Sequence, residues 1–243
     1  MKSVFITGTD TGVGKTVVAA SLLAAARARG IDAVPMKPVQ TGCSRNLAAP
    51  DLDFCLRAAQ FKPQPNEQDL MCPYRFIPAC GPHLAARLAH KRIRIGKIAG
   101  AFRRLSSLHE TVIVEGAGGV LVPIDEKNSM LDIMKSLQLP VILVARTGLG
   151  TINHTLLSLA ELRRAKLDVI GVVLVQSAPG KQGVIEKDNA RTIGKLGLAP
   201  VLACLPFQKH FNSAAFTPLL SPVFRILEKP SYVDSSRCSR TKL

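Results

Sequence analysis

A glycine-rich loop near the N-terminus places the tightest limit on how this chain can fold. The apolar run Ser3–Thr7 leads into the loop Gly8–Thr16, and a helical pattern follows over Lys15–Arg29. Five residues separate the first and last glycines of the loop, one more than in the usual phosphate-binding pattern. The glycines let backbone amides approach a phosphate, and a helix N-terminus favours anions. Lys15 suits the outer phosphates and Thr16 suits Mg²⁺, so the segment predicts a strand, a phosphate-binding turn and a helix.

Short apolar runs alternate with longer amphipathic stretches along the chain. Near-continuous Val, Ile and Leu in the short runs indicates strands that are buried on both faces. With the loop, this alternation predicts an α/β fold of the P-loop NTPase-like class, with a mostly parallel sheet flanked by helices. The expected strands are Ser3–Thr7, Ala33–Met36, Thr111–Glu115, Pro140–Ala145, Val169–Val175 and Pro200–Leu205. The expected helices are Lys15–Arg29, Asp51–Ala59, Pro82–His90, Ile95–Leu105, Met130–Leu137, Ile152–Ala165 and Ile185–Leu196.

The length of 243 residues has room for one large α/β domain or two small ones, and we expect a single domain over residues 1–228. The Pro-rich stretch Lys62–Pro82 interrupts the alternation and is expected to be a long loop near the ligand. The pattern degrades after Phe207. Residues 229–243 carry four basic residues against one acid, which predicts a disordered basic tail.

Composition excludes several classes of protein. The chain opens directly into a β-branched run and has no long uncharged apolar window, so we expect neither a signal peptide nor a membrane span. Six cysteines without a C-x-x-C pair predict free thiols in a reducing cytoplasm. The net charge of +15 favours anionic partners, although a solvated basic surface explains it equally well. Nine Phe, two Tyr and no Trp offer few platforms for single-stranded nucleic acid.

Charged residues end two of the expected strands. Lys37 follows the second strand, where it can point into the ligand crevice and neutralise a phosphoryl group or a carbamate. Position alone leaves a solvated lysine as an alternative. Glu115 ends the strand Thr111–Glu115 and precedes the small-residue turn Gly116–Gly119, which is the layout of a Mg²⁺-holding acid beside a nucleotide phosphate. The alternative is a carboxylate that merely ends a strand.

Other polar residues have simpler explanations. Asp51 and Asp53 open a helix, where capping and the helix dipole would account for one of them. His83 follows Pro82 at another helix start and is expected to pack or to cap. No spacing of Ser, His and Asp, or of His and Cys, supports a catalytic triad or a metal cluster.

Taken together, these motifs resemble the dethiobiotin synthetase family over roughly residues 3–207, in the family's order. The phosphate loop, the lysine motif and the segment 149–154 are the more particular of the matches. The matching segments are Gly8–Thr16, Lys37–Gly42, Pro73–Phe76, Pro82–His83, Val114–Gly119, Leu139–Val144 and Leu149–His154.

The resemblance implies an ATP- and Mg²⁺-dependent ligase of biotin biosynthesis. It would close the ureido ring of 7,8-diaminononanoate with CO₂ or bicarbonate to give dethiobiotin, through a carbamate and a carbamic-phosphoric anhydride. Lys15 and Lys37 would stabilise the phosphoryl and carbamate oxygens, and Thr41 would contact the diamine. The implied metal ligands are Thr16, Asp51 and Glu115. The implied nucleotide-binding residues are Gly12, Val13, Gly14, Lys15, Thr16, Val17, Asp51, Glu115, Gly116, Ala117, Gly118, Val175, Gln176, Pro206, Phe207 and Gln208.

The resemblance also implies a homodimer, with no nucleic-acid or membrane partner. A turn that contains Gly150, Thr151 and Asn153 would receive the substrate's carboxylate from the partner subunit. Family members often carry an asparagine that reads adenine where this chain has Val175, so adenine recognition is either weaker or moved to Gln176.

A ParA/MinD-like ATPase switch is the main alternative on the same fold. Those proteins carry an extra lysine near the start of the phosphate loop, and the matching residue here is Asp10.

The phosphate loop also differs from that of some dethiobiotin synthetases. Gly12 stands where those proteins have glutamate, which changes the local charge and keeps the loop.

Overall fold

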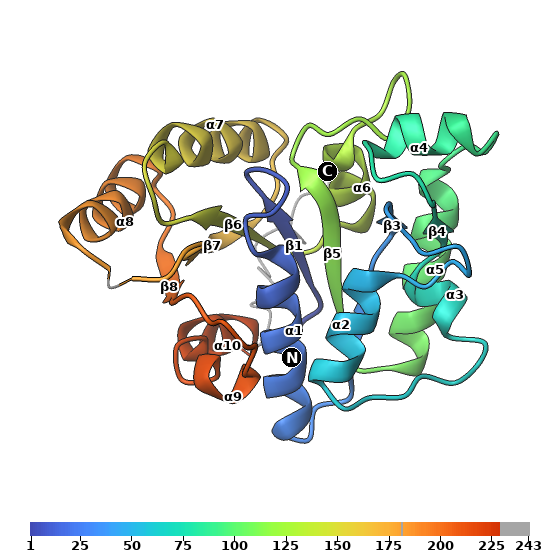
Figure 1. Cartoon of the computed structure of the whole chain (residues 1–243), viewed down its shortest axis with the longest axis horizontal. Coiled ribbons are helices and arrows are strands. Elements are labelled where there is room, and N and C mark those ends of the chain that lie inside the picture. The colour runs from blue at the N-terminus through green and yellow to red at the C-terminus, as the bar shows by residue number, and fades with distance from the viewer. Residues whose placement is uncertain (181, 229–243) are drawn as a thin grey trace, which may run out of the picture.

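The computed structural model describes residues 1–180 and 182–228 of the chain. Within them, six strands form one sheet in the order β2-β5-β1-β6-β7-β8, and every neighbouring pair is parallel (Figure 1). The predicted α/β class is therefore confirmed. The strands of this sheet are β1 (Val4–Gly8), β2 (Ala33–Met36), β5 (Thr111–Gly119), β6 (Val141–Arg146), β7 (Val169–Val175) and β8 (Val201–Leu205).

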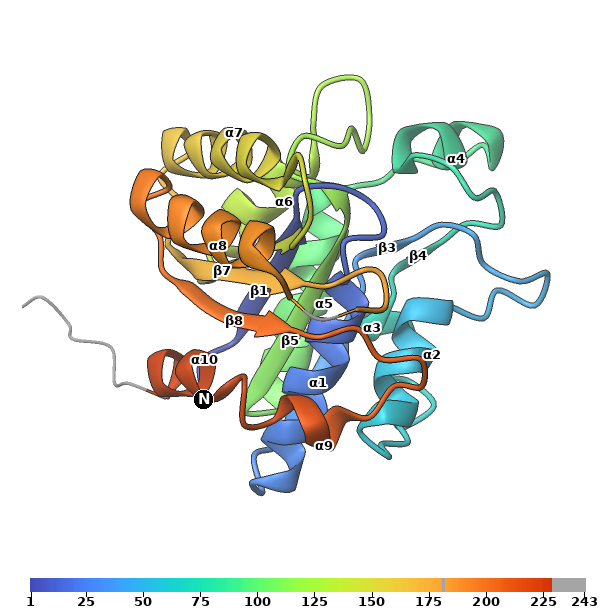
Figure 2. The ribbon, with the colours of Figure 1, turned by 60° about the vertical axis from the view of Figure 1, so that its left-hand side comes forward.

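Helices cover both faces of the sheet, as Figures 1 and 2 show. Buried side chains of α1, α9 and α10 form one apolar cluster against the sheet, and those of α5, α6, α7 and α8 contribute to the other. This double cover explains why the strands are apolar on both faces. The helices are α1 (Lys15–Ala28), α2 (Pro50–Ala58), α3 (Gln68–Met71), α4 (Pro82–Leu88), α5 (Ile95–Leu108), α6 (Met130–Leu137), α7 (Thr151–Arg164), α8 (Val184–Leu196), α9 (Ser213–Phe216) and α10 (Ser221–Leu227).

The central position of β1 fixes where the phosphate loop emerges. Phe5 pairs with Val114 of β5 on one side and with Val141 of β6 on the other. The last residue of β1, Gly8, lies beside Gly119 and Val144, and the loop continues from there at the carboxyl edge of the sheet. Ligands of parallel α/β sheets bind at this edge.

A second, two-stranded sheet was not predicted. Strand β3 (Val39–Gln40) pairs in parallel with β4 (Tyr74–Arg75), and β4 lies within the stretch Lys62–Pro82 that was expected to be a long loop. Two further backbone hydrogen bonds extend the pairing, from Phe76 N to Gln40 O at 2.9 Å and from Cys43 N to Phe76 O at 2.9 Å. We call this the small sheet. It holds the segment after Lys37 beside the main sheet.

The region after Phe207 is more regular than its sequence pattern indicates. It forms α9 and α10, whose side chains Phe216 and Phe224 are fully buried against the α1 face. The expected tail over residues 229–243 lies outside the described residues, and the expectation of a single domain over residues 1–228 stays a prediction.

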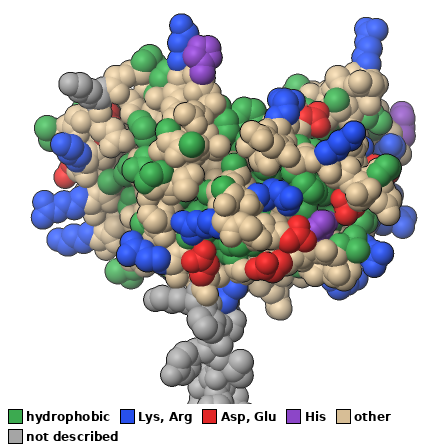
Figure 3. All heavy atoms as spheres, turned by 90° about the horizontal axis from the view of Figure 1, so that it is seen from below, with side chains coloured by type: hydrophobic (Ala, Val, Ile, Leu, Met, Phe, Trp, Pro, Cys, Tyr) green, Lys and Arg blue, Asp and Glu red, His purple; other side chains and the backbone are tan. Residues whose placement is uncertain are grey.

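Two surface properties bear on possible partners. In the part of the chain that the structure describes, none of the helices has the length and apolar character needed to cross a bilayer. On the face shown in Figure 3, Lys and Arg side chains are spread out, and acidic side chains lie among some of them. The basic charge is therefore not gathered into one patch on that face.

Candidate active site

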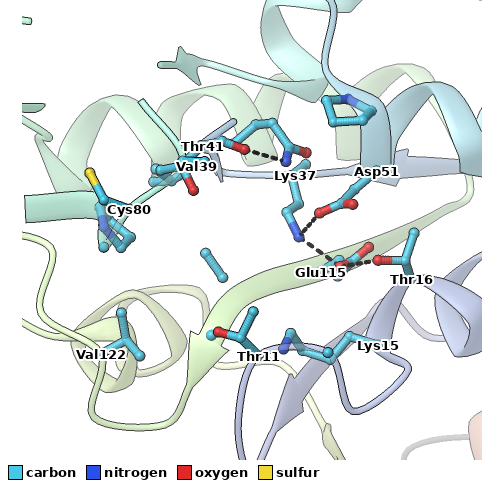
Figure 4. A pocket seen from close by; sticks show the side chains of 18 of the residues that line it. Thr11, Lys15, Thr16, Lys37, Val39, Thr41, Asp51, Cys80, Glu115 and Val122 are labelled. Carbon is cyan, nitrogen blue, oxygen red and sulfur yellow. Dashed lines mark hydrogen bonds and ion pairs between the residues drawn. The ribbon is translucent and has the colours of Figure 1, made fainter. Parts of the chain in front are cut away.

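A cavity of about 790 Å³ opens where β1, β2 and β5 end (Figure 4). One side, which we call the phosphate-loop wall, consists of residues 11–17 and the end of β5. The other side, the small-sheet wall, consists of residues 39–41 and 79–82. The lining residues are Thr11, Gly12, Gly14, Lys15, Thr16, Val17, Lys37, Val39, Gln40, Thr41, Pro50, Asp51, Ala79, Cys80, Gly81, Pro82, Glu115, Ala117, Gly118 and Val122.

Backbone geometry at the start of α1 makes the phosphate-loop wall suited to anions. Gly14 precedes the helix with φ 101°, a left-handed conformation that glycine adopts readily. A Cβ at this position would lie 2.8 Å from Cγ1 of Val175, so the loop passes close to the end of β7. The first amides of a helix have no carbonyl partner within the helix, and here they border the cavity.

Polar contacts brace the same loop from the neighbouring strand. The Asp10 carboxylate accepts a hydrogen bond from Thr11 N at 2.6 Å. Arg146, at the end of β6, donates to Thr11 O at 3.1 Å and lies 3.4 Å from Oδ2 of Asp10. Lys15 Nζ donates to Asp10 O at 2.7 Å, so the lysine folds back over its own loop.

Lys37 lies in the floor of the cavity and is buried, with 4% of its surface exposed. Its Nζ lies 2.6 Å from Oε1 of Glu115 and 2.7 Å from Oδ2 of Asp51 (Figure 4). It also donates to the carbonyl of Gly116 at 3.3 Å. The structure therefore favours the crevice interpretation of Lys37 over that of a solvated lysine.

Glu115 links the lysine to the phosphate loop. Its side chain is buried, and Oε1 accepts hydrogen bonds from Lys37 Nζ and from the Thr16 hydroxyl at 2.9 Å. Two carboxylates and one hydroxyl thus converge from β5, α2 and α1. They are hard oxygen donors of the kind that Mg²⁺ prefers.

The two lysines have opposite electrostatic settings. Burial and the nearby charge of Lys37 lower the pKa of Lys15 to about 8, and carboxylates oppose this only in part. Burial also disfavours the charged form of Lys37, but Glu115 and Asp51 outweigh it and hold the pKa of Lys37 above its ordinary value. Among the described residues, Lys15 therefore has no carboxylate within ion-pair distance, whereas Lys37 has two.

The structure separates the two aspartates that open α2. Burial acts to raise the pKa of Asp51, but Lys37 outweighs it, so the pKa of Asp51 lies below its ordinary value. Asp51 lines the cavity, whereas Asp53 is not among the lining residues. The geometry therefore supports Asp51 as the second acidic residue of the site.

Gln40 and Cys80 line the cavity beside Thr41, and sequence reasoning missed both. Gln40 is buried in β3, and its Nε2 donates to the Thr41 carbonyl at 2.9 Å. Its place inside the lysine motif was the available signal. Cys80 comes from the loop after β4, and without the pairing of the small sheet nothing indicates that it reaches this site.

Several residues implied by the family resemblance lie away from this cavity. Val175 contacts the phosphate loop through Gly14, and Val13 is buried beneath the loop. Gln176 Nε2 donates to the carbonyls of Ala178 and Gly180 at 2.9 and 2.8 Å. The remaining implied residues that do not line the cavity are Gly116, Gly150, Thr151, Asn153, Pro206, Phe207 and Gln208.

Comparisons with known proteins bear on what this arrangement is. Residues 2–215 match the model of a family described as an AAA domain. The chain is 43% identical over 208 residues to the ATP-dependent dethiobiotin synthetase BioD of Anaeromyxobacter dehalogenans, covering 86% of this chain and 91% of the relative. It is 34% identical over 215 residues to the protein of the same name from Bacillus velezensis, covering 88% and 90%.

Solved structures with low identity share the fold. The cell division ATPase MinD of Pyrococcus furiosus superposes with a TM-score of 0.57 at 17% identity, covering 93% of this chain and 100% of that one. A ParA family ATPase from Chlorobium tepidum superposes with a TM-score of 0.53 at 14% identity, covering 95% of each chain. These similarities place the chain among P-loop folds and carry no further functional information.

Proposed function

The chain belongs to the ATP-dependent dethiobiotin synthetase family, and from that premise we propose the reaction that its cavity performs. As the sequence motifs indicated, it is a ligase that makes dethiobiotin in biotin biosynthesis. In the proposed reaction it closes the ureido ring of 7,8-diaminononanoate with CO₂ at the expense of ATP. The observation that carries the proposal is Lys37, a buried ammonium between two carboxylates where the phosphate-loop wall meets the small-sheet wall.

The proposed chemistry proceeds in three steps. One amine of the substrate adds to CO₂ and loses a proton, which gives a carbamate. A carbamate oxygen attacks the γ-phosphorus of ATP, and ADP leaves. The second amine then attacks the carbonyl carbon and loses a proton, so the ring closes and phosphate leaves. Negative charge develops on oxygens in each of the last two steps, and a buried cation stabilises such charge strongly.

The two lysines divide this task in the proposal. Lys15, at the start of α1, would contact the outer phosphates together with the first amides of the helix. Lys37 would stabilise the carbamate and the transferring phosphoryl group, because its ammonium lies in the floor of the cavity, between Asp51 and Glu115. Thr41, on the small-sheet wall, would contact the diamine.

The charges of the cavity suit a divalent cation as well. Among the lining residues, Lys15 and Lys37 balance Asp51 and Glu115, so a polyphosphate would add negative charge with no compensation. Thr16, Asp51 and Glu115 offer oxygen donors, and the ammonium between the two carboxylates shows that a cation is tolerated there. We therefore propose these three residues as the holders of Mg²⁺. When bound, the ion would neutralise phosphate charge beside the phosphate loop.

The base of the nucleotide has a less obvious partner. Val175 offers an apolar side chain where an amide would read adenine, and the Gln176 amide already donates to its own loop. We propose that the ends of β7 and β8, with Pro206, Phe207 and Gln208, form an adenine site that reads the base weakly.

A homodimer is the proposed state, because the cavity does not include residues 149–153. Leu149 is 95% exposed, Gly150 and Asn153 are exposed, and Gly150 precedes α7 with φ 86°. The start of α7 is a helix N-terminus and would accept a carboxylate. We propose that it completes the site of the partner subunit by receiving the distant carboxylate of the diamine.

One assay tests the function directly. ADP release is measured from ATP and Mg²⁺ with and without 7,8-diaminononanoate and bicarbonate, and dethiobiotin is measured by mass spectrometry. We expect ADP release to require the diamine, because without a carbamate the γ-phosphoryl group has no acceptor. A monoamine analogue, which cannot close a ring, should give no dethiobiotin-like product. Rapid ATP hydrolysis that responds to DNA or membranes and ignores the diamine would instead support a switch ATPase.

Mixing two inactive variants tests the shared site. A Lys37→Ala subunit keeps its α7 start, and an Asn153→Ala subunit keeps its cavity. If the start of α7 serves the partner, their mixed dimer contains one intact site and regains part of the activity. A monomer in light scattering that is fully active at micromolar concentration would contradict the proposal.

A further inference from the structure

Gln40 carries a polar atom that the protein leaves unpaired. The residue lies in β3, lines the cavity and is 5% exposed. Its Nε2 donates to the Thr41 carbonyl at 2.9 Å, and its Oε1 is buried without a hydrogen-bond partner among the described residues. Buried oxygens without a partner are rare because they lose water and gain nothing in return.

The position of this oxygen distinguishes it from the other unpaired atoms. Thr7 Oγ1 and Arg75 Nε are also buried without partners in the described residues, but neither residue lines this cavity. Gln40 does, and it lies between Lys37 and Thr41 in the sequence. An unpaired acceptor in a cavity wall is a place where a bound ligand can supply the missing donor.

The chemistry of an amide oxygen limits which ligand group can bind it. The oxygen only accepts hydrogen bonds, so phosphates and carboxylates cannot be its partner. Of the reacting groups in the proposed function, the amines of the diamine are the donors. In this structure neighbouring atoms cover the oxygen. Rotation about the last side-chain bond, a soft torsion in glutamine, would turn the oxygen toward the cavity and release Nε2 from the Thr41 carbonyl.

We propose that Gln40 orients the diamine by accepting a hydrogen bond from one of its amino groups. The inference rests on the proposed function and adds a residue to the same site. A neutral acceptor has a specific advantage here. A carboxylate would favour the protonated ammonium, which has no lone pair to attack CO₂ or the anhydride, whereas an amide holds the amine without stabilising its charge.

Gln40→Leu tests the contact at nearly constant side-chain size. We expect KM for the diamine to rise about tenfold, the usual scale for one lost hydrogen bond. KM for ATP should change by a smaller factor, because Lys15 and the loop amides are untouched, although the Gln40 amide also helps to lower the pKa of Asp51. The matched control is Gln68→Leu, an exposed residue at the start of α3 that does not line the cavity. Its KM for both substrates should equal that of the wild type.

Gln40→Glu distinguishes a side chain that accepts a hydrogen bond from the diamine from one that only donates hydrogen bonds within the protein. Glutamate keeps an acceptor oxygen but, like leucine, cannot donate to the Thr41 carbonyl or to Asp51, whose pKa the Gln40 amide helps to lower. If Gln40 acts by accepting, this variant should keep KM for the diamine near the wild-type value, and its kcat profile should move to higher pH because the bound amine holds its proton longer. The charged groups that line the cavity, Lys15, Lys37, Asp51 and Glu115, are the same in both proteins. If Gln40 only holds Thr41, Glu and Leu should raise KM alike with no movement of the profile.

A measurement on the wild type covers the case in which a variant fails to fold. The side-chain amide signal of Gln40 in ¹⁵N NMR should shift when the diamine is added and stay in place when ATP alone is added. An unmoved signal, or a folded Gln40→Leu variant with a wild-type KM for the diamine, would overturn the inference while leaving the proposed function standing. A wild-type protein that makes no dethiobiotin would refute the function itself.

Discussion

The two walls of the cavity are built in different ways. The phosphate-loop wall comes from a strand, a tight turn and a helix that follow one another in sequence, and from the end of β5. The small-sheet wall comes from a two-residue strand and from a loop that follows β4, held together by backbone pairing. Most of the first wall is one continuous segment, whereas the second is assembled from distant segments. In the proposed function, the first wall binds phosphate and substrate choice lies in the wall with less regular structure.

The lysines of the two regions show the same contrast. The pKa of Lys15 is lowered to about 8 by burial and by Lys37, and the charges of Glu115, Asp51 and Asp10 oppose this only in part. Lys37 is held by two carboxylates at 2.6 and 2.7 Å. In the proposed function, Lys15 adds a phosphate to its existing contact with the Asp10 carbonyl, whereas Lys37 meets the reacting anion while it is paired with two carboxylates. Three experiments can break or sharpen this contrast.

Replacing Lys37 should have the largest effect. In Lys37→Met we expect kcat for dethiobiotin formation to fall by roughly 10²–10³, the scale of one lost electrostatic contact in a transition state. ATP affinity should change little, because Lys15 and the loop amides remain. The free energy of unfolding should fall by about 3 kcal/mol, because Glu115 is left as a buried charge without its lysine partner. Dethiobiotin formation measures the change in kcat, and urea denaturation of the same preparation measures the change in stability.

A double variant separates the two consequences. Adding Glu115→Gln to Lys37→Met removes the uncompensated charge, so stability should recover while activity does not. If Lys37→Met keeps near wild-type product formation, Lys37 has no part in the mechanism.

The pH dependence of nucleotide binding should show the intermediate effect. Free Lys15 is charged below pH 8 and neutral above it, so binding of a polyphosphate at higher pH requires uptake of a proton. We therefore expect affinity for ATP to fall about tenfold between pH 7 and pH 9. Calorimetry in EDTA removes the contribution of metal ions. In Lys15→Arg the side chain stays charged over this pH range, so ATP affinity should change only through the titration of ATP itself. An equal fall in ATP affinity in both proteins would show that Lys15 does not titrate between pH 7 and pH 9.

Glycine substitutions in the phosphate loop test its rigidity through their effect on stability. Gly14→Ala forces alanine to φ 101° with its Cβ 2.8 Å from Val175, which should destabilise the fold by about 2–3 kcal/mol. In Gly12→Ala the added Cβ meets no atom within 4 Å, and the residue has φ 71°. The free energy of unfolding should therefore fall by only about 1 kcal/mol. Chemical denaturation of both variants without nucleotide compares them. Equal losses would mean that contact with Val175 does not constrain the loop.

The phosphate-loop wall was predictable because each of its parts is local. The order of strand, glycines, Lys15 and helix appears in one stretch of sequence, and Glu115 is marked by its place at the end of an apolar run. Burial of Lys37 was left open, since a sequence position at a strand end does not say whether a carboxylate lies opposite. The ion pairs with Asp51 and Glu115 arise only when three separate elements meet.

The small sheet and the last helices were missed for physical reasons. A two-residue strand has no alternation to detect, and β3 pairs with a segment far along the chain. In α9 and α10 the buried residues Phe216 and Phe224 belong to short helices whose apolar positions span too few turns to show a period. Gln40 stood inside a recognised motif, but its unpaired oxygen becomes apparent only from the surrounding atoms.

The central place of β1 also has a consequence for how the protein is made. The phosphate loop is synthesised before β5 and β6, yet its strand pairs with both, and Thr9 N donates to Val144 O. A nascent chain that ends before these strands cannot hold the loop in its binding conformation. Parallel sheets with such distant partners form slowly, and their apolar strands stay exposed in the meantime. The ribosome therefore synthesises the chain through β6 before ATP can bind the loop and stabilise the fold. Chaperones can bind the exposed apolar strands during that interval.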